Sequence, residues 1–98
     1  MAQPSFQDIL DQYDYYLQEF SYIKIWDEMS ARDRELARSI AKGNCDAAAI
    51  EQDTGMNSKT YSVYRVRLKK KGLVDGSVYG RVTFSLPRFA EFVLSQPL

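Results

Sequence analysis

Apolar side chains recur at intervals of three and four residues from residue 6 to residue 23. They are Phe6, Ile9, Leu10, Tyr13, Leu17, Phe20 and Ile23. This spacing places them on one stripe of an amphipathic helix, the longest element that the sequence predicts. We expect the end of this helix to pack on the rest of the domain through Phe20, Ile23 and Trp26, which stand nearest the next predicted helix and have large apolar areas to bury.

Further aromatic side chains surround this stripe, more than one helix needs to cover a small core. They are Tyr15, Tyr16, Tyr22 and Trp26. Aromatic residues at helical spacing usually belong to a core, which predicts their burial against the body of the domain. The alternative is a surface that meets a partner, and a homo-oligomer formed through this aromatic helix is one such arrangement.

The next two predicted helices have clear signals at their ends. Ser30 can cap a helix through the amide of Asp33, whose carboxylate can reach back in a capping box, and Gly43 ends that helix. Asp46 then caps a short helix, which closes at a tight corner where Gly55 supplies a positive φ angle. The inward side chains of the two helices are expected to be Leu36, Ala37, Ile40, Ala49 and Ile50.

A third helix is predicted after this corner, from about residue 58 to residue 71. Its inward side carries Tyr61, Tyr64, Arg65 and Leu68. Its outward side carries Lys59, Ser62, Val63, Val66, Arg67 and Lys70. A short helix, a glycine turn and a second helix with a polar and basic outer face are typical of a helix-turn-helix.

The period of the apolar residues changes after this helix. Around Gly76 and Gly80 they alternate with polar neighbours, as in two antiparallel strands joined by a turn. These residues are Leu73, Val74, Val78, Val82, Phe84 and Leu86. Pro87 suits the first turn of a closing helix, whose apolar stripe is Phe89, Phe92 and Val93.

The order of these elements predicts a mainly α fold with a small β-hairpin. It is a winged helix-turn-helix preceded by a long amphipathic helix, in which the hairpin is the wing. We divide the chain into residues 1–29, an N-terminal helical segment that packs on the domain, and residues 30–98, the winged-helix domain.

Two stretches of the sequence, IWDEMSARDRELARSIAKG and TGMNSKTYSVYRVRLKKKGLVDGSVYGRVTFSLPRFAEFV, also point to a family. Together they resemble the winged-helix region at the C-terminal end of a group of prokaryotic AAA-type ATPases. The resemblance covers roughly residues 22–95, and its most telling parts are YSVYRVRL, KKGLVDG and LPRFAEFV. It implies that this chain is the C-terminal module of such a protein without its ATP-binding motor domain. A motor domain is therefore an expected partner, whereas the resemblance by itself implies no ligand.

The net charge of zero conceals a division of the chain into an acidic part and a basic part. Residues 1–57 hold eleven acidic and five basic side chains, whereas residues 58–98 hold eight basic and two acidic ones. A basic part attracts phosphate, but an acidic part of the same small domain repels it. Any binding of DNA must therefore depend on a local basic face.

Composition limits the other classes of function. Cys45 is the one cysteine and the chain has no histidine, so neither an internal disulfide nor a Cys/His zinc site is expected. A lone thiol and an acidic N-terminal segment predict a cytoplasmic protein without a signal peptide or a membrane span.

No arrangement of residues indicates catalysis. Cys45 lacks a histidine to act as its base, and the neighbouring carboxylates Asp27 with Glu28 and Asp33 with Glu35 point apart on a helix. We therefore expect no enzymatic activity, no metal and no cofactor.

Two hypotheses remain for the third helix and the hairpin. In the DNA hypothesis the contacts come from Lys59, Ser62, Arg67, Lys70 and Arg81. Lys59 and Ser62 would meet bases or phosphate, Arg67 and Lys70 would hold the backbone, and Arg81 would reach a groove or phosphate from the wing. In the alternative, Val63 and Val66 form the centre of a protein interface, and the chain is an interaction or regulatory domain of an ATPase.

Overall fold

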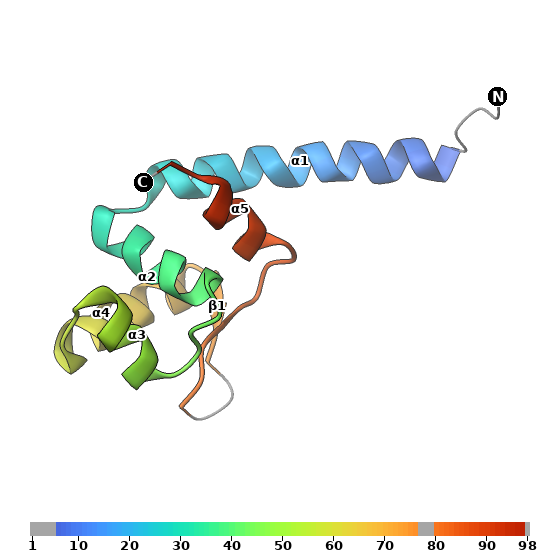
Figure 1. Ribbon diagram of the computed structural model, residues 1–98. Helices are drawn as coiled ribbons and strands as arrows, with labels where there is room; N and C mark the ends of the chain where they lie inside the picture. Colours follow the sequence, from blue (N-terminus) through green and yellow to red (C-terminus); the bar gives the residue numbers. More distant parts are fainter. Residues whose placement is uncertain (1–5, 77–79, 98) are drawn as a thin grey trace.

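The computed structural model describes the backbone of residues 6–76 and 80–97, and the side chains of residue 12 and of residues 14 onwards within those ranges (Figure 1). The helices are α1 (Phe6–Glu28), α2 (Ala31–Ala41), α3 (Ala47–Thr54), α4 (Ser58–Lys70) and α5 (Phe89–Ser95). The strands are β1 (Val74–Asp75) and β2 (Thr83–Phe84). The prediction of a mainly α fold with a small antiparallel hairpin is confirmed, and the arrangement is compatible with a winged helix.

The body of the domain surrounds α2, which packs against α3, α4 and α5. One core joins these helices to the hairpin and to the end of α1. Its most deeply buried large side chains are Leu36, Ile50, Leu68, Val82, Phe89 and Val93. The expected burial of the inward side chains of α2, α3 and α5 is thus confirmed at Leu36, Ile50 and Phe89.

The structure confirms the predicted helix caps. Each of them depends only on residues that are close together in the sequence. Ser30 and Asp33 form the full capping box at the start of α2, and the Asp46 side chain accepts a hydrogen bond from the Ala49 amide at the start of α3. Gly55 closes α3 in the left-handed conformation, with φ at 77°. Such a backbone conformation favours glycine.

The hairpin pairs Val74 with Phe84 and Asp75 with Thr83 in antiparallel register. It is tied to the loop before α3, because the Val82 amide donates a hydrogen bond of 2.8 Å to the Cys45 carbonyl and a bridge joins Asp46 to Arg81. The wing therefore has a fixed base beside the helix-turn-helix. The expected strand position of Val78 lies outside the described residues.

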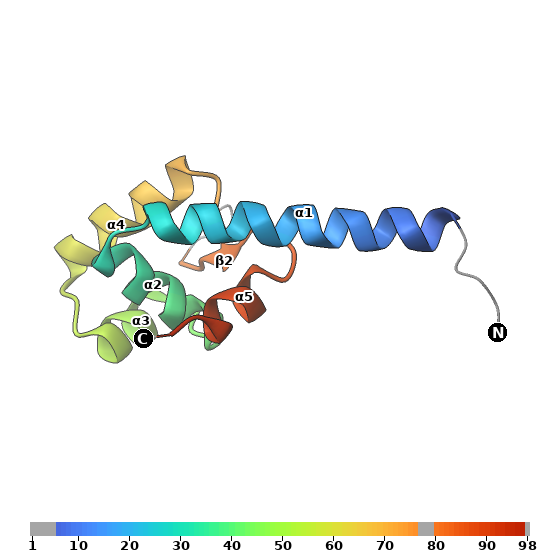
Figure 2. The ribbon, with the colours of Figure 1, turned by 90° about the horizontal axis from the view of Figure 1, so that it is seen from above.

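The prediction for α1 is right at Trp26 and wrong at Phe20 and Ile23. Trp26 is 6% exposed, but Phe20 is 70% and Ile23 is 43% exposed. The side of α1 that meets the body is formed instead by Tyr22, Ile25, Trp26 and Met29. The physical reason is that α1 has two apolar sides, and on one of them the Tyr22 hydroxyl reaches the Pro87 carbonyl and the Trp26 ring packs edge-on against Phe92. Figures 1 and 2 show the other end of α1 projecting well beyond the body.

The closing helix begins later than expected. Pro87 was predicted in its first turn, but α5 starts at Phe89, after Arg88 in a left-handed conformation with φ at 59°. The Pro87 carbonyl accepts a hydrogen bond of 2.7 Å from the Tyr22 hydroxyl, and Arg88 Nη2 donates one of 2.7 Å to Gln18 Oε1. These contacts hold the segment before α5 against α1, which explains the late start of the helix.

Candidate nucleic-acid interface

The corner between α3 and α4 fixes the direction of α4. After Gly55 the chain turns over Met56, which is buried, and its amide donates to the Thr54 hydroxyl at 3.2 Å. Asn57 then caps α4 by accepting a 2.8 Å hydrogen bond from the Thr60 amide. The start of α4 is thus rigidly placed and open to solvent, and it carries the positive end of the helix dipole.

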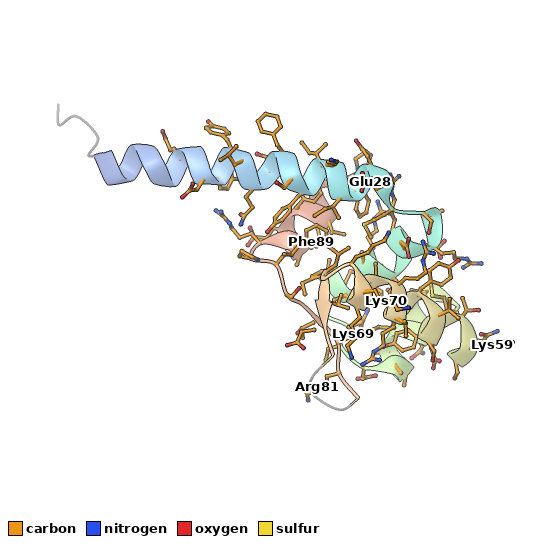
Figure 3. All side chains as sticks on the ribbon, turned by 180° about the vertical axis from the view of Figure 1, so that it is seen from behind. Glu28, Lys59, Lys69, Lys70, Arg81 and Phe89 are labelled. Carbon is orange, nitrogen blue, oxygen red and sulfur yellow. The ribbon has the colours of Figure 1, made fainter. Side chains whose placement is uncertain are left out.

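The outer face of α4 carries four of the predicted residues. They are Lys59, Val63, Val66 and Lys70, all exposed and within less than half a turn of one another on the helical wheel. Figure 3 shows Lys59 at one end of α4 and Lys70 towards the other. Lys70 comes eleven residues after Lys59, which corresponds to a rise of about 16 Å along the helix. We call this set of four residues the outer face.

The two valines stand between the two lysines on the outer face. Val63 is 52% exposed and Val66 is 44% exposed. The predicted exposure of the four residues of the outer face is therefore confirmed. The lysines of the outer face are suited to the phosphates of DNA, and its valines are suited to an apolar surface of a protein partner.

Ser62 lies beside the outer face, at the edge of a groove between α4 and the hairpin. The groove is lined by Ala47, Tyr61, Ser62, Arg65, Gly76 and Gly80. The Arg65 guanidinium lies directly over Gly76, where even a Cβ atom would displace it. Glycine at this position thus lets Arg65 fill the floor of the groove, close to the wing.

Arg81 is exposed on the hairpin, on the strand that returns towards β2 (Figure 3). Its backbone pairs with Asp46, so the base of the side chain is held while its head is directed outwards. Among the described residues, neither Arg81 nor Lys59, Lys69 or Lys70 forms an ion pair. These cations are therefore available to an external anion.

Arg67 differs from the other predicted contacts because it has a partner within the fold. Its Nε and Nη2 atoms donate to Asp33 Oδ1 and Oδ2 at 3.2 and 3.0 Å. Lys71 Nζ approaches the same carboxylate at 3.8 Å. The structure thus places Arg67 in a bidentate salt bridge between α4 and the start of α2, and any contact that it makes with DNA remains a prediction.

Asp33 is fully buried, and it ties the capping box of α2 to the last turns of α4. Burial alone would raise the pKa of its carboxyl, but the hydrogen bonds from Arg67 and Ser30 outweigh burial and hold the pKa below its usual value. The hydrogen bonds to Asp33, together with its negative charge, in turn raise the pKa of Arg67. Asp33 thus stabilises the fold in its charged form.

Replacing Asp33 with asparagine is expected to reduce the acid sensitivity of the fold. Because the folded pKa is lowered, the carboxylate contributes stability above its unfolded pKa of about 3.9, and this contribution is lost as the pH falls through the folded pKa. Unfolding followed by circular dichroism from pH 7 to pH 2, about the range in which carboxylates titrate, should show a smaller slope for Asp33→Asn than for the wild-type chain. Equal slopes would show that Asp33 has no special role in acid unfolding.

Sequence reasoning missed two residues of this region. Asp33 was assigned only to the capping box, because its partner Arg67 lies 34 residues further along the chain and no local spacing connects them. Lys69 was left out of the set of contacts, although Figure 3 shows it beside Lys70 on the side of α4 towards the hairpin. The run of three lysines at residues 69–71 was the available signal.

The described part of the chain contains no group of three or more His, Cys, Asp or Glu side chains that could hold a metal ion. None of the helices within the described ranges combines the length and the apolar character needed to cross a membrane.

Comparison with known families assigns most of the chain to one of them. A family model described as Domain of unknown function (DUF8462) matches residues 20–93, which is well over half of the 98 residues. The chain belongs to the DUF8462 family. The matched DUF8462 region contains α2, α3, α4, the hairpin and most of α5, together with the end of α1 that packs on the body. Searches of curated proteins and of solved structures gave no match. The DUF8462 match itself shows no link to AAA-type ATPases.

Proposed function

We propose that this chain is a non-enzymatic winged-helix module that binds DNA through the outer face of α4 and through the wing. One observation carries the proposal: Lys59, Lys70 and Arg81 are exposed beside a helix-turn-helix and form no ion pair with any described residue. In helix-turn-helix proteins the second helix enters the major groove with its N-terminal residues towards the bases. Lys59 and Ser62 stand in the first turns of α4, and Arg81 stands on the wing.

The electrostatics of this region support the same assignment. α4 contains five basic residues and no acidic one. Most of α1 projects beyond the body (Figure 2), although its Glu28 lines a pocket with Lys71 just after α4. A DNA backbone that lies along α4 would therefore contact basic side chains. At the start of the helix, its phosphates would also face the positive end of the helix dipole.

A second function is favoured by the two exposed valines of the outer face. Adjacent exposed β-branched side chains at the centre of a face are suited to a protein contact. Since the sequence also resembles the C-terminal winged-helix region of AAA-type ATPases, the partner in this alternative is an ATPase motor domain. The chain would then be an interaction or regulatory domain without direct contact to DNA.

Substitutions on the outer face test the choice between these functions. If α4 binds DNA, Lys59→Ala and Lys70→Ala should each weaken binding to a fluorescent duplex. Each should also reduce the slope of log affinity against log salt by roughly one unit per lost phosphate contact. Arg81→Ala should have a similar effect, while its melting temperature stays close to that of the wild-type chain because the side chain is exposed.

Matched controls separate a local contact from a change in total charge. Lys42→Ala removes the same charge from the end of α2, where the lysine pairs with Asp53 on the surface, and it should leave the salt slope unchanged. Val63→Ala and Val66→Ala should also have little effect on DNA binding. If only the valine variants act, by weakening association with a purified motor domain, the DNA proposal is wrong and the alternative is supported.

A further inference from the structure

The side of α1 that faces away from the body carries a stripe of exposed apolar residues. This α1 stripe consists of Tyr16, Leu17, Phe20 and Ile23, whose exposed fractions are 58%, 50%, 70% and 43%. Phe20 lies between about a third and half of a helical turn from Tyr22, Ile25 and Trp26, the α1 side chains that meet the body. The α1 stripe is therefore separate from the core. It is a second, opposite face, and its contiguous apolar surface is typical of a contact site.

We infer that the α1 stripe pairs with the α1 stripe of a second copy of the chain, with the two helices parallel. Tyr16, Phe20 and Ile23 follow one another at intervals of four and three residues, which are the intervals of the a and d positions of a coiled coil. In the sequence the same alternation continues backwards along the helix through Tyr13, Ile9 and Phe6. With its 23 residues, α1 offers roughly three heptads for this pairing.

The charges beside the α1 stripe are complementary between two parallel copies. With Phe20 at an a position, Glu19 occupies the preceding g position and Lys24 the following e position. In a parallel pair a g residue faces the e residue five positions later on the other helix, so Glu19 of each copy would meet Lys24 of the other. Both side chains are exposed, and neither forms an ion pair with a described residue of its own chain. An antiparallel pair would match g with g and e with e, and it would lose this complementarity.

The body leaves room for such a pair. It contacts α1 through the side opposite to the α1 stripe, and the N-terminal half of the helix projects beyond it (Figures 1 and 2). Asp27 follows Phe20 by one heptad and ends the apolar pattern. Like charges at this position would end the pairing of the two helices near residue 27. Because each body packs on the side of α1 opposite to the α1 stripe, the two bodies would lie on opposite outer sides of the pair.

The molar mass of the intact chain in solution, measured by light scattering or sedimentation equilibrium over a range of concentrations, tests this inference. We expect a reversible dimer, and Phe20→Asp should raise the dissociation constant at least about tenfold, because it places a charge at the centre of the apolar contact. Leu94→Asp is the matched control: Leu94 is 53% exposed on α5, and its substitution should leave the dissociation constant unchanged. Circular dichroism of both variants checks that they remain folded.

Charge exchange tests the parallel orientation separately. Glu19→Lys and Lys24→Glu should each weaken the dimer by roughly three- to tenfold, because each turns two attractive pairs into repulsive ones. The variant with both changes should regain the wild-type dissociation constant, and the two single variants should associate with each other more tightly than either does with itself.

Three outcomes would contradict the inference. A wild-type chain that stays monomeric at every concentration, or a Phe20→Asp variant with an unchanged dissociation constant, would exclude a second copy as the occupant and leave the stripe to a different protein. Dimers that do not respond to charge exchange would exclude the parallel pairing of Glu19 with Lys24. DNA is absent from all of these experiments, so their results do not depend on whether the chain binds DNA.

Discussion

Trp26→Ala is expected to lower the free energy of unfolding by about 3–5 kcal/mol, the usual cost of truncating a buried large aromatic side chain. Trp26 is 6% exposed, and its ring packs edge-on against Phe92 with 6.5 Å between centroids. The guanidinium groups of Arg34 and Arg38 lie 5.1 and 5.6 Å from the centre of the ring. The substitution would remove the main contact between α1 and the body together with two cation–π interactions.

Urea unfolding followed by circular dichroism measures this loss. Small domains have total stabilities of about 5–15 kcal/mol, so a loss of this size would remove a large part of the total, and the urea concentration at the midpoint of unfolding should fall markedly. Leu94→Ala is the control, since it removes an exposed side chain and should change the stability by no more than about 0.5 kcal/mol. If Trp26→Ala lowers the free energy of unfolding no more than this control does, the packing of Trp26 against the body does not stabilise the fold.

The second large effect is expected at Phe89, which joins three parts of the fold. Its side chain is fully buried, with its ring centroid 5.0 Å from that of Tyr22 on α1, 5.1 Å from that of Phe84 on β2 and 5.9 Å from that of Phe92 on α5. Figure 3 shows Phe89 directly beneath α1. Phe89→Ala should therefore cost about 3–5 kcal/mol of unfolding free energy, and it should loosen α1 and the hairpin together.

Phe89→Leu separates the loss of volume from the loss of the aromatic contacts. Leucine refills most of the space that alanine leaves empty, so Phe89→Leu should cost clearly less than Phe89→Ala in the same unfolding measurement. Hydrogen exchange should show faster exchange at the amides of Val82 and Ser85 in the alanine variant, because these amides hold the hairpin to the loop before α3 and to Leu73. Equal costs for the two variants, with unchanged exchange in the hairpin, would show that Phe89 does not link the wing to the core.

The features that depend on neighbouring residues could be predicted from the sequence. Ser30, Asp46 and Gly55 define helix ends through contacts within three or four residues or through their own backbone preferences, and the structure places each of them as expected. The exposure of Val63 and Val66 followed from helical periodicity alone. Such local rules are reliable because tertiary packing rarely has to override them.

The features that depend on distant residues could not be predicted. Helical periodicity gave α1 an apolar stripe but not the side that the body covers, because that choice depends on the shape of α5 and on contacts such as that of the Tyr22 hydroxyl with Pro87, 65 residues away. For the same reason the sequence indicated Arg67 as a free cation. Its partner Asp33 is adjacent only after α2 and α4 have packed.

Arg67 therefore requires separate treatment when the basic residues of α4 are tested. Arg67→Ala would leave a buried carboxylate without its main partner, so a loss of DNA binding by this variant could come from a loss of folding. Lys59 and Lys70 lack such a link among the described residues, and changes at these positions report on binding directly.

The most direct test of the central claim, that α4 and the wing bind DNA, is a titration of the wild-type chain with a fluorescent duplex at several salt concentrations. Phosphate contacts gain most strength at low ionic strength, so binding should be tightest there, and log affinity should fall linearly with log salt. If Lys59, Lys70 and Arg81 each contact one phosphate, the slope should be roughly −3, at about −0.9 per contact. A chain that leaves the anisotropy of the duplex unchanged even at the lowest salt concentration would contradict the claim.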